Sequence, residues 1–221
     1  MQNFDTPTPV FAVLDIPAGR VQLIAADRTD TVVEVRPADA TKGRDVTVAE
    51  QTTIDFRNGV LSVEAEAKNH VLGSAGSIEV TVQLPAGSRV EVKAASVELR
   101  GVGRFGEVAV EGAQGDIKVD EAASVRVRTH AGDVSVGRLT GPAEITTDKG
   151  NILIAEAVRG TVVLSTQAGD VSVAAAAGSS AFLDAGTTLG RIHNALVSTT
   201  AVPELNIRAT TAYGDITARS L

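Results

Sequence analysis

The chain has 221 residues, of which 43% are hydrophobic and 3% aromatic, so a core would consist of Val, Ile, Leu and Ala. The net charge of −7 comes without a stripe of Lys and Arg, which argues against nucleic-acid binding. The chain has no cysteine, which excludes disulfides and Cys-type zinc sites. Residues 1–7 lack the pattern of a secretion signal, and no apolar run is long enough for a membrane span. We therefore expect a cytoplasmic protein without membrane insertion.

The first part of the chain, residues 1–94, predicts an antiparallel or mixed β region that could cap the repeats in the rest of the chain. Short apolar and β-branched runs occupy residues 10–16, 20–24 and 31–35. Between the first two runs, Pro17-Ala18-Gly19 predicts a tight reversal of the chain. The polar residues 37–45 are typical of a loop.

A hairpin is predicted further along this region. Asn58-Gly59 separates the alternating runs 54–57 and 60–63, and Asn-Gly supplies the two positive φ angles of a type I′ turn. Residues 68–77 predict a loop, and residues 77–84 predict another strand.

From Gly106 onwards, a Gly followed by a polar residue and two alternating apolar residues recurs about every nine residues. Alternation with period two is typical of a strand with one buried face. The repeats start at Gly106, Gly115, Ala123, Gly132, Gly141, Gly150, Gly160 and Gly169, and less regularly at Gly190 and Gly214.

Short strands at a fixed spacing predict a parallel β-helix or β-solenoid over residues 95–221, with two strands in a coil of about eighteen residues. A β-sandwich is the alternative, and residues 1–94 could belong to one continuous domain with the rest. No helix is expected, because the only run of helix formers, residues 174–177, ends at Gly178.

The last coil of a solenoid exposes unpaired backbone groups. Because the chain stops soon after Gly214, the segment Asp215–Leu221 could pair with another copy, giving a dimer or a filament. On this hypothesis Ile216→Lys would weaken oligomers without unfolding the monomer. The alternatives are that residues 178–203 fold over the end, or that Arg219 keeps the end soluble.

The residue after each repeat glycine is usually Asp or Asn, and this forms the most regular polar column. A ladder of cations is one interpretation, but one carboxylate per coil falls short of the six to eight oxygens that Ca²⁺ takes. The alternative is that these side chains bind the backbone of their own turn. The column consists of Asp116, Asp133, Asn151, Asp170, Arg191 and Asp215.

Other candidates for chemistry are weaker. The three histidines, His70, His130 and His193, are too scattered to share a metal ion. The stretch 101–106 has G-x-G-x-x-G spacing but leads into a strand, where it cannot bind a pyrophosphate. We therefore predict no catalytic, cofactor-binding or metal-binding residue and no cofactor. Hydroxyl side chains before the glycines could form ladders or a flat binding face: Thr129, Thr146, Thr147, Ser165, Thr166, Thr210 and Thr211.

Three stretches together with the Gly-Asp-Val repeats carry a resemblance to a known family: residues 4–7, residues 26–37 and residues 77–88. The chain resembles the bacterial β-strand-repeat family of unknown function that is often labelled "putative adhesin". The resemblance covers nearly the whole chain and implies a β-solenoid, with no catalytic residues to transfer.

The predicted function is that of a non-enzymatic scaffold or interaction protein whose partner is a second copy or another protein. The alternative is an adhesin-like module that binds a surface or a glycan. A third hypothesis, a hydrolase or lyase on a β-helix, would need convergent carboxylates from adjacent coils.

Overall fold

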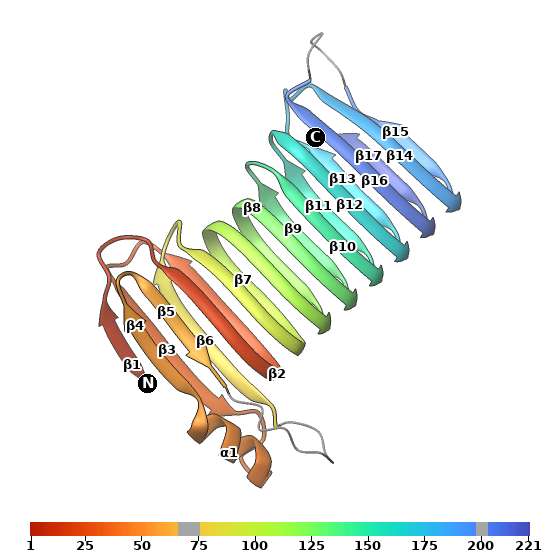
Figure 1. Cartoon of the computed structure of the whole chain (residues 1–221). Helices are drawn as coiled ribbons and strands as arrows, with labels where there is room; N and C mark the ends of the chain where they lie inside the picture. The colour runs from red at the N-terminus through yellow and green to blue at the C-terminus, as the bar shows by residue number, and fades with distance from the viewer. Residues whose placement is uncertain (66–75, 198–202) are drawn as a thin grey trace. The chain divides into compact units, whose positions relative to one another are not determined.

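The computed structural model describes residues 1–65, 76–197 and 203–221. It is an all-β chain that divides into two compact units, Met1–Gly115 (unit 1) and Asp116–Leu221 (unit 2). Figure 1 shows the strands of both units with their labels. The boundary expected near residue 94 falls inside the long strand β7 of unit 1, and it stays a prediction.

Unit 1 is a mixed β structure, as expected for this part of the chain. Strand β7 pairs in parallel with β2 along two stretches, residues 89–94 with 11–16 and residues 96–103 with 18–25. Each of the two strands therefore makes one coil, with one stretch on each face. On one face β5 and β4 extend this ladder, and on the other face β6, β3 and β1 extend it. The elements are β1 (Gln2–Asp5), β2 (Phe11–Ala26), β3 (Asp30–Pro37), α1 (Gly43–Gln51), β4 (Thr53–Arg57), β5 (Val60–Glu64), β6 (Ile78–Pro85) and β7 (Arg89–Gln114).

The predicted hairpin is confirmed. Strands β4 and β5 pair antiparallel with Arg57 opposite Val60, and Asn58 and Gly59 have φ of 53° and 78°. The ring of Phe56 on β4 lies 5.3 Å from the ring of Phe4 on β1, measured between centroids. Aromatic packing between the last strands of the two faces therefore closes this end of the unit 1 core.

Two local expectations for unit 1 were wrong. The stretch Pro17-Ala18-Gly19 does not reverse the chain, because β2 runs through it and only turns a corner from one face to the other. No helix was expected, but α1 begins at Gly43, inside the stretch 37–45 that was predicted as a loop, and continues to Gln51. The buried carboxylate of Asp45 accepts a hydrogen bond of 3.0 Å from the backbone N–H of Ser77, a tertiary contact that a local pattern does not reveal. The loop predicted at 68–77 lies mostly outside the described residues.

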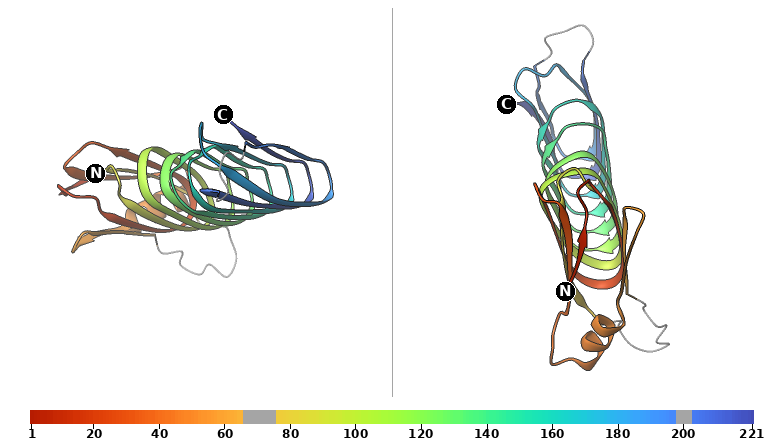
Figure 2. Two further views of the ribbon diagram at one scale, coloured as in Figure 1. Left: turned by 90° about the horizontal axis from the view of Figure 1, so that it is seen from above. Right: turned by 90° about the vertical axis from the view of Figure 1, so that its left-hand side faces the viewer.

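Unit 2 is a parallel β-solenoid, which confirms the predicted fold class and the two strands per coil. Figure 2 shows its coils from two further sides. The strands are β8 (Ile117–Ala131), β9 (Val134–Leu139), β10 (Ala143–Lys149), β11 (Ile152–Ala157), β12 (Gly160–Ala168), β13 (Val171–Ala175), β14 (Ala181–Leu189), β15 (Ile192–Ala195), β16 (Leu205–Tyr213) and β17 (Ile216–Ser220).

The core of unit 2 consists of apolar columns in which one residue from each coil stacks on its neighbour. Ile117 lies beside Val134, and the column continues through Ile152 and Val171 to Ile216, all of them at most 2% exposed. These are the positions that the alternation placed on the buried face. Stacked β-branched side chains in register fill a thin core without aromatic residues.

Glycines at the corners allow the coils to approach closely. Gly150 has φ of 147°, and a Cβ added there would lie 2.1 Å from the carbonyl oxygen of Gly132 in the preceding coil. Only a residue without a side chain fits both the backbone angle and this contact. The repeat of Gly is therefore a packing requirement of the stacked corners.

The coils of unit 2 do not stack in sequence order. β16 pairs in parallel with β12 on one side and with β14 on the other, and β17 likewise lies between β13 and β15. The final coil of the chain is thus inserted between its two predecessors. Within the stretch that the alternative places over the end, the described strands β14 and β15 do cover β16 and β17, which agrees with that alternative.

The hypothesis that Ile216 lies at an open end was consequently wrong. Ile216 is fully buried, because β17 has a neighbouring strand on each side. The last coil of unit 2 is formed by β14 and β15, which we call the outer coil.

Candidate functional site

The column of Asp and Asn side chains ties neighbouring coils together. One side-chain oxygen of each Asp or Asn accepts a hydrogen bond from the backbone N–H of the column residue in the neighbouring coil. The expected hydrogen bonds to the backbone of the same turn are not the ones that form this column. These bonds are 2.7 to 2.9 Å long and run from Asp133 N to Asp116, Asn151 N to Asp133, Asp170 N to Asn151, Asp215 N to Asp170 and Arg191 N to Asp215. One oxygen of each side chain therefore has a structural role.

Within the described residues, no group of three or more His, Asp and Glu side chains is placed to hold a metal ion. The ring of His130 lies 2.7 Å from the carboxylate of Asp148 on an exposed surface, and His193 lies on β15. His70 lies outside the described residues. The stretch 101–106 is part of strand β7, so no helix N-terminus follows it.

The hydroxyl side chains fall into two sets that serve different purposes. Thr129, Thr147, Thr166 and Thr211 are buried, and Thr166 and Thr211 donate hydrogen bonds of 3.0 Å to the carbonyl oxygens of corner glycines. Thr146, Ser165 and Thr210 lie on the outer surface of neighbouring strands, where Thr210 contacts Ser165 at 3.1 Å. The first set supports the coils, and the second set forms a short surface row.

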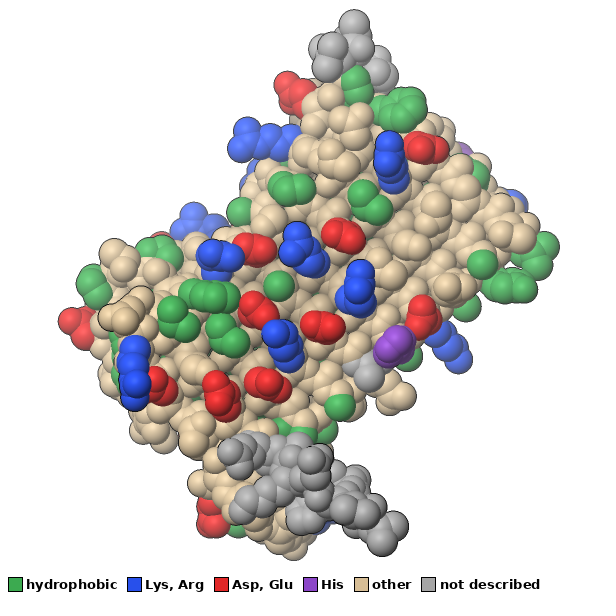
Figure 3. All heavy atoms as spheres, viewed as in Figure 1, with side chains coloured by type: hydrophobic (Ala, Val, Ile, Leu, Met, Phe, Trp, Pro, Cys, Tyr) green, Lys and Arg blue, Asp and Glu red, His purple; other side chains and the backbone are tan. Residues whose placement is uncertain are grey.

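Charged side chains on the surface of unit 2 pair mainly between adjacent coils. Arg126 lies 3.9 Å from Glu144, and Arg138 lies 3.7 Å from Glu156. In the space-filling view, basic and acidic side chains alternate over the visible face (Figure 3). Exposed pairs of this kind stabilise a fold by at most about 1 kcal/mol each.

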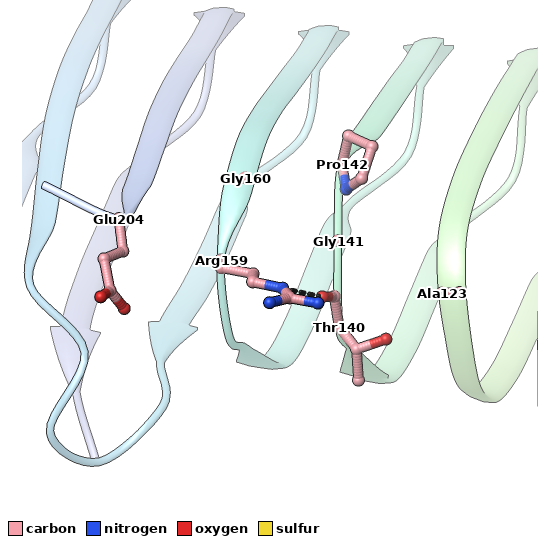
Figure 4. A pocket seen from close by; sticks show the side chains of 7 residues that line it. All are labelled: Ala123, Thr140, Gly141, Pro142, Arg159, Gly160 and Glu204. Carbon is pink, nitrogen blue, oxygen red and sulfur yellow. Dashed lines mark hydrogen bonds between the residues drawn. The ribbon is translucent and has the colours of Figure 1, made fainter.

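A shallow groove runs along one corner of unit 2. Its volume is about 630 Å³, and it is lined by Ala123, Thr140, Gly141, Pro142, Arg159, Gly160 and Glu204. Arg159 points along the groove and its Nε donates a hydrogen bond of 3.3 Å to the Thr140 carbonyl, while Glu204 lies directly before β16 (Figure 4). The groove offers one cation and one carboxylate, with backbone groups between them.

The outer coil is the more distinctive surface. Among the described residues, β14 pairs with β16 and β15 pairs with β17, and no strand pairs with their other sides. The two strands carry a single charged side chain, Asp184, and contain no Pro. Natural proteins usually protect an open edge with such residues, so this edge is unusually free to accept another strand.

Exposed apolar side chains gather around this edge. Within the described part of unit 2, all the large exposed hydrophobic residues except Leu153 lie on the two outermost coils or directly after them. Ile192 occupies the column of Ile216 but is 46% exposed, because no further coil covers it. The others are Phe182, Leu189, Val197, Tyr213 and Leu221.

The sequence placed an open coil at this end of the chain but assigned it to the wrong strands. A signal was present: residues 181–195 contain an alternating run, a corner glycine and a second short run, which together make one complete coil. The pattern gave no indication that the next repeat, β16 and β17, lies between this coil and the coil of β12 and β13.

Stacked parallel coils with glycine corners define a protein of the β-solenoid class. The chain belongs to the Toastrack DUF4097 family, whose model matches residues 15–220. No curated protein matches the chain. No helix in the described residues is long and apolar enough to cross a bilayer.

Two solved structures share this fold. A "putative adhesin" from Bacteroides fragilis has a TM-score of 0.58 at 15% identity, over 98% of this chain and 95% of that one. A "putative adhesin" from Parabacteroides distasonis has a TM-score of 0.51 at 12% identity, over 98% of this chain and 96% of that one. At these identities the similarity shows the fold alone.

Proposed function

We propose that this protein is a non-enzymatic scaffold or interaction protein that self-associates through its outer coil. The observation that supports this most is the unprotected edge of β14 and β15, where backbone donors and acceptors and exposed apolar side chains occur together. Pairing with another strand would satisfy the backbone groups and cover Ile192 and Phe182. A cytoplasmic location belongs to the same proposal.

The alternative is an adhesin-like module that binds a surface or a glycan. It is supported by the two similar structures described as "putative adhesin" and by the corner groove with Arg159. The groove is shallow and contains no aromatic side chain on which a sugar ring could stack. The outer coil therefore has the stronger physical argument.

The experiment is the absolute mass in solution, measured by light scattering over a hundredfold range of concentration. We expect the mass to rise from 22.7 kDa towards a defined multiple as the concentration increases. A mass of 22.7 kDa at every concentration would contradict self-association and favour the surface-binding alternative.

A variant locates the contact. Gly186 lies in β14, and a side chain added there meets no atom within 4 Å, so Gly186→Lys should fold normally and place a charge on the edge. We expect at least a tenfold weaker association. Ser165→Lys is the matched control, because Ser165 lies in the same surface row but two strands inside the edge, and it should associate as the unaltered protein does.

A further inference from the structure

We infer that two copies join by a two-fold rotation, with β14 of one copy pairing antiparallel with β14 of the second copy, and β15 with β15. This inference rests on the proposed function and adds the partner surface and its register. The two-fold axis would run perpendicular to the two faces of the outer coil and pass near Gly186.

The lengths and directions of the edge strands support this pairing. β14 has nine residues and β15 has four, and they lie on opposite faces of one coil. A rotation about an axis normal to both faces reverses the strand direction and keeps each strand on its own face. Each edge strand therefore meets a partner of equal length, and both ladders continue across the joint.

A head-to-tail filament would instead require the outer coil to pair with the edge strands of unit 1. Those strands are β1, with four residues, and β4, with five, so neither can match the length of β14. β4 also carries Asp55 and Arg57, whose side chains form an ion pair of 3.0 Å. Short and charged edge strands are typical of ends that avoid pairing.

The side chains of β14 suit a self-pairing centred on Gly186. The smallest residue would then face its own copy at the axis, where the two backbones approach. Asp184 would face the second copy's Thr188, so that a hydroxyl and not a second carboxylate lies opposite the only charge on the strand. Like charges placed directly opposite each other would oppose the pairing.

Single cysteines test this arrangement, because the chain has none of its own. Residues directly opposite each other in an antiparallel pair have Cα atoms about 4.5–5.5 Å apart, within the range that a disulfide bridges. Under mild oxidation, two Gly186→Cys thiols each lose a proton and an electron to an added oxidant and form one S–S bond. We expect most of this variant to run as a covalent dimer on a non-reducing gel.

The control is Ser165→Cys, in the same surface row and two strands inside the edge. With strands about 4.8 Å apart, its sulfurs would be roughly 20 Å or more from each other, so it should cross-link at least tenfold more slowly. A second test mixes Asp184→Cys with Thr188→Cys. The mixture should cross-link faster than either variant alone, because residues 184 and 188 face each other only in this register.

Three outcomes would overturn the inference. Equal rates of cross-linking for Gly186→Cys and Ser165→Cys would mean that the disulfides form in random collisions and not across a β14–β14 pair. Faster cross-linking of Gly186→Cys with His193→Cys than with itself would mean that β14 meets β15. In both cases a concentration-dependent mass would leave the proposed self-association standing. A constant mass of 22.7 kDa would instead remove the proposed function together with this inference.

Discussion

Asp215 shows how one side chain holds the outer coil in place. Its Oδ1 accepts the backbone N–H of Arg191 at 2.8 Å, and its Oδ2 lies 3.0 Å from the guanidinium of the same residue. The backbone hydrogen bond first, and then the guanidinium, lower the pKa of the Asp215 carboxyl below its usual 3.8. Both contacts stabilise the charged form, and they join the corner before β17 to the corner before β15.

This contact should make the stability of the protein depend on pH in acid. Because the folded pKa of Asp215 lies below 3.8, the unfolded chain binds more protons between the folded value and 3.8. The stabilisation is therefore present above pH 3.8 and is lost as the pH falls through the folded pKa. Asp215→Asn, which keeps an oxygen acceptor but loses the charge, should be less stable than the unaltered protein near pH 7.

The measurement is the denaturant midpoint of both proteins at a series of pH values. The difference in midpoint between them should shrink once the pH falls below about 4. A difference that stays constant down to pH 2 would show that the charge of Asp215 does not contribute to folding stability. Asn151 occupies the same column in another coil, where its uncharged amide oxygen accepts the equivalent hydrogen bond. The geometry of the column therefore accepts an amide, as Asp215→Asn requires.

At the scale of elements, the inserted coil of β16 and β17 decides which surfaces are core and which are edge. Ile192 and Ile216 lie side by side in one column, on β15 and β17. Ile216 is fully buried between two strands, whereas Ile192 is 46% exposed at the end of the column. The same residue type in the same position of the repeat thus has two different roles.

We expect Ile216→Ala to lower the free energy of unfolding by about 2–5 kcal/mol, since it leaves a cavity between two coils. Ile192→Ala should cost less than half as much, because its side chain is already partly in water. Urea unfolding of the two variants, each followed at a concentration where the protein is monomeric, gives the comparison. Equal losses would mean that Ile192 is covered within the monomer, so that the outer coil would not be an open edge. Ile216→Lys should unfold the protein, so it cannot serve as a test of association.

For the whole molecule, local stability should decrease towards the open edge. Strands β10 to β13 have a paired strand on each side, whereas β14 and β15 have one partner each among the described residues. Amides with fewer buried neighbours open more easily. The net charge of −7 also makes copies repel one another, so the proposed association would require a surface with few charges, such as this edge.

Hydrogen exchange read by mass spectrometry tests this at several protein concentrations. In dilute solution, peptides from β14 and β15 should exchange faster than peptides from β10 and β11. On raising the concentration, we expect selective protection of the outer coil, with no change in the inner coils, which serve as the internal control. Protection that increases evenly along the chain, or nowhere, would argue against a contact at this edge.

The local pattern was sufficient for most strands of the solenoid and for the hairpin. The alternation at Val134 and Val136 put both side chains in the core, and Asn58-Gly59 produced the expected turn. It was not sufficient for α1, whose Val46, Thr47 and Val48 are poor helix formers. There the helix is supported by tertiary contacts such as that of Asp45 with the Ser77 backbone.

The sequence could predict that the candidate site is an unpaired edge strand, but not which strands form it. That a terminal coil would have an unpaired edge follows from any solenoid, but its location does not. Leu205–Tyr213 and Ala181–Leu189 are both nine-residue strands followed by a corner glycine, and either could have stacked on β12. Ile207 and Ala209 bury fully in the inner position, whereas the corresponding side chains of β14 are partly exposed.

By itself, the sequence determined that this protein consists of short strands, which side chains face inward, and where the corners lie. These features result from alternation and glycine spacing, which act between residues close in the chain. Only the tertiary structure decided the stacking order of the coils, and with it the identity of the open edge. Parallel strands with similar apolar patterns offer nearly the same backbone edge to one another, so the choice among them depends on packing between residues far apart in the chain.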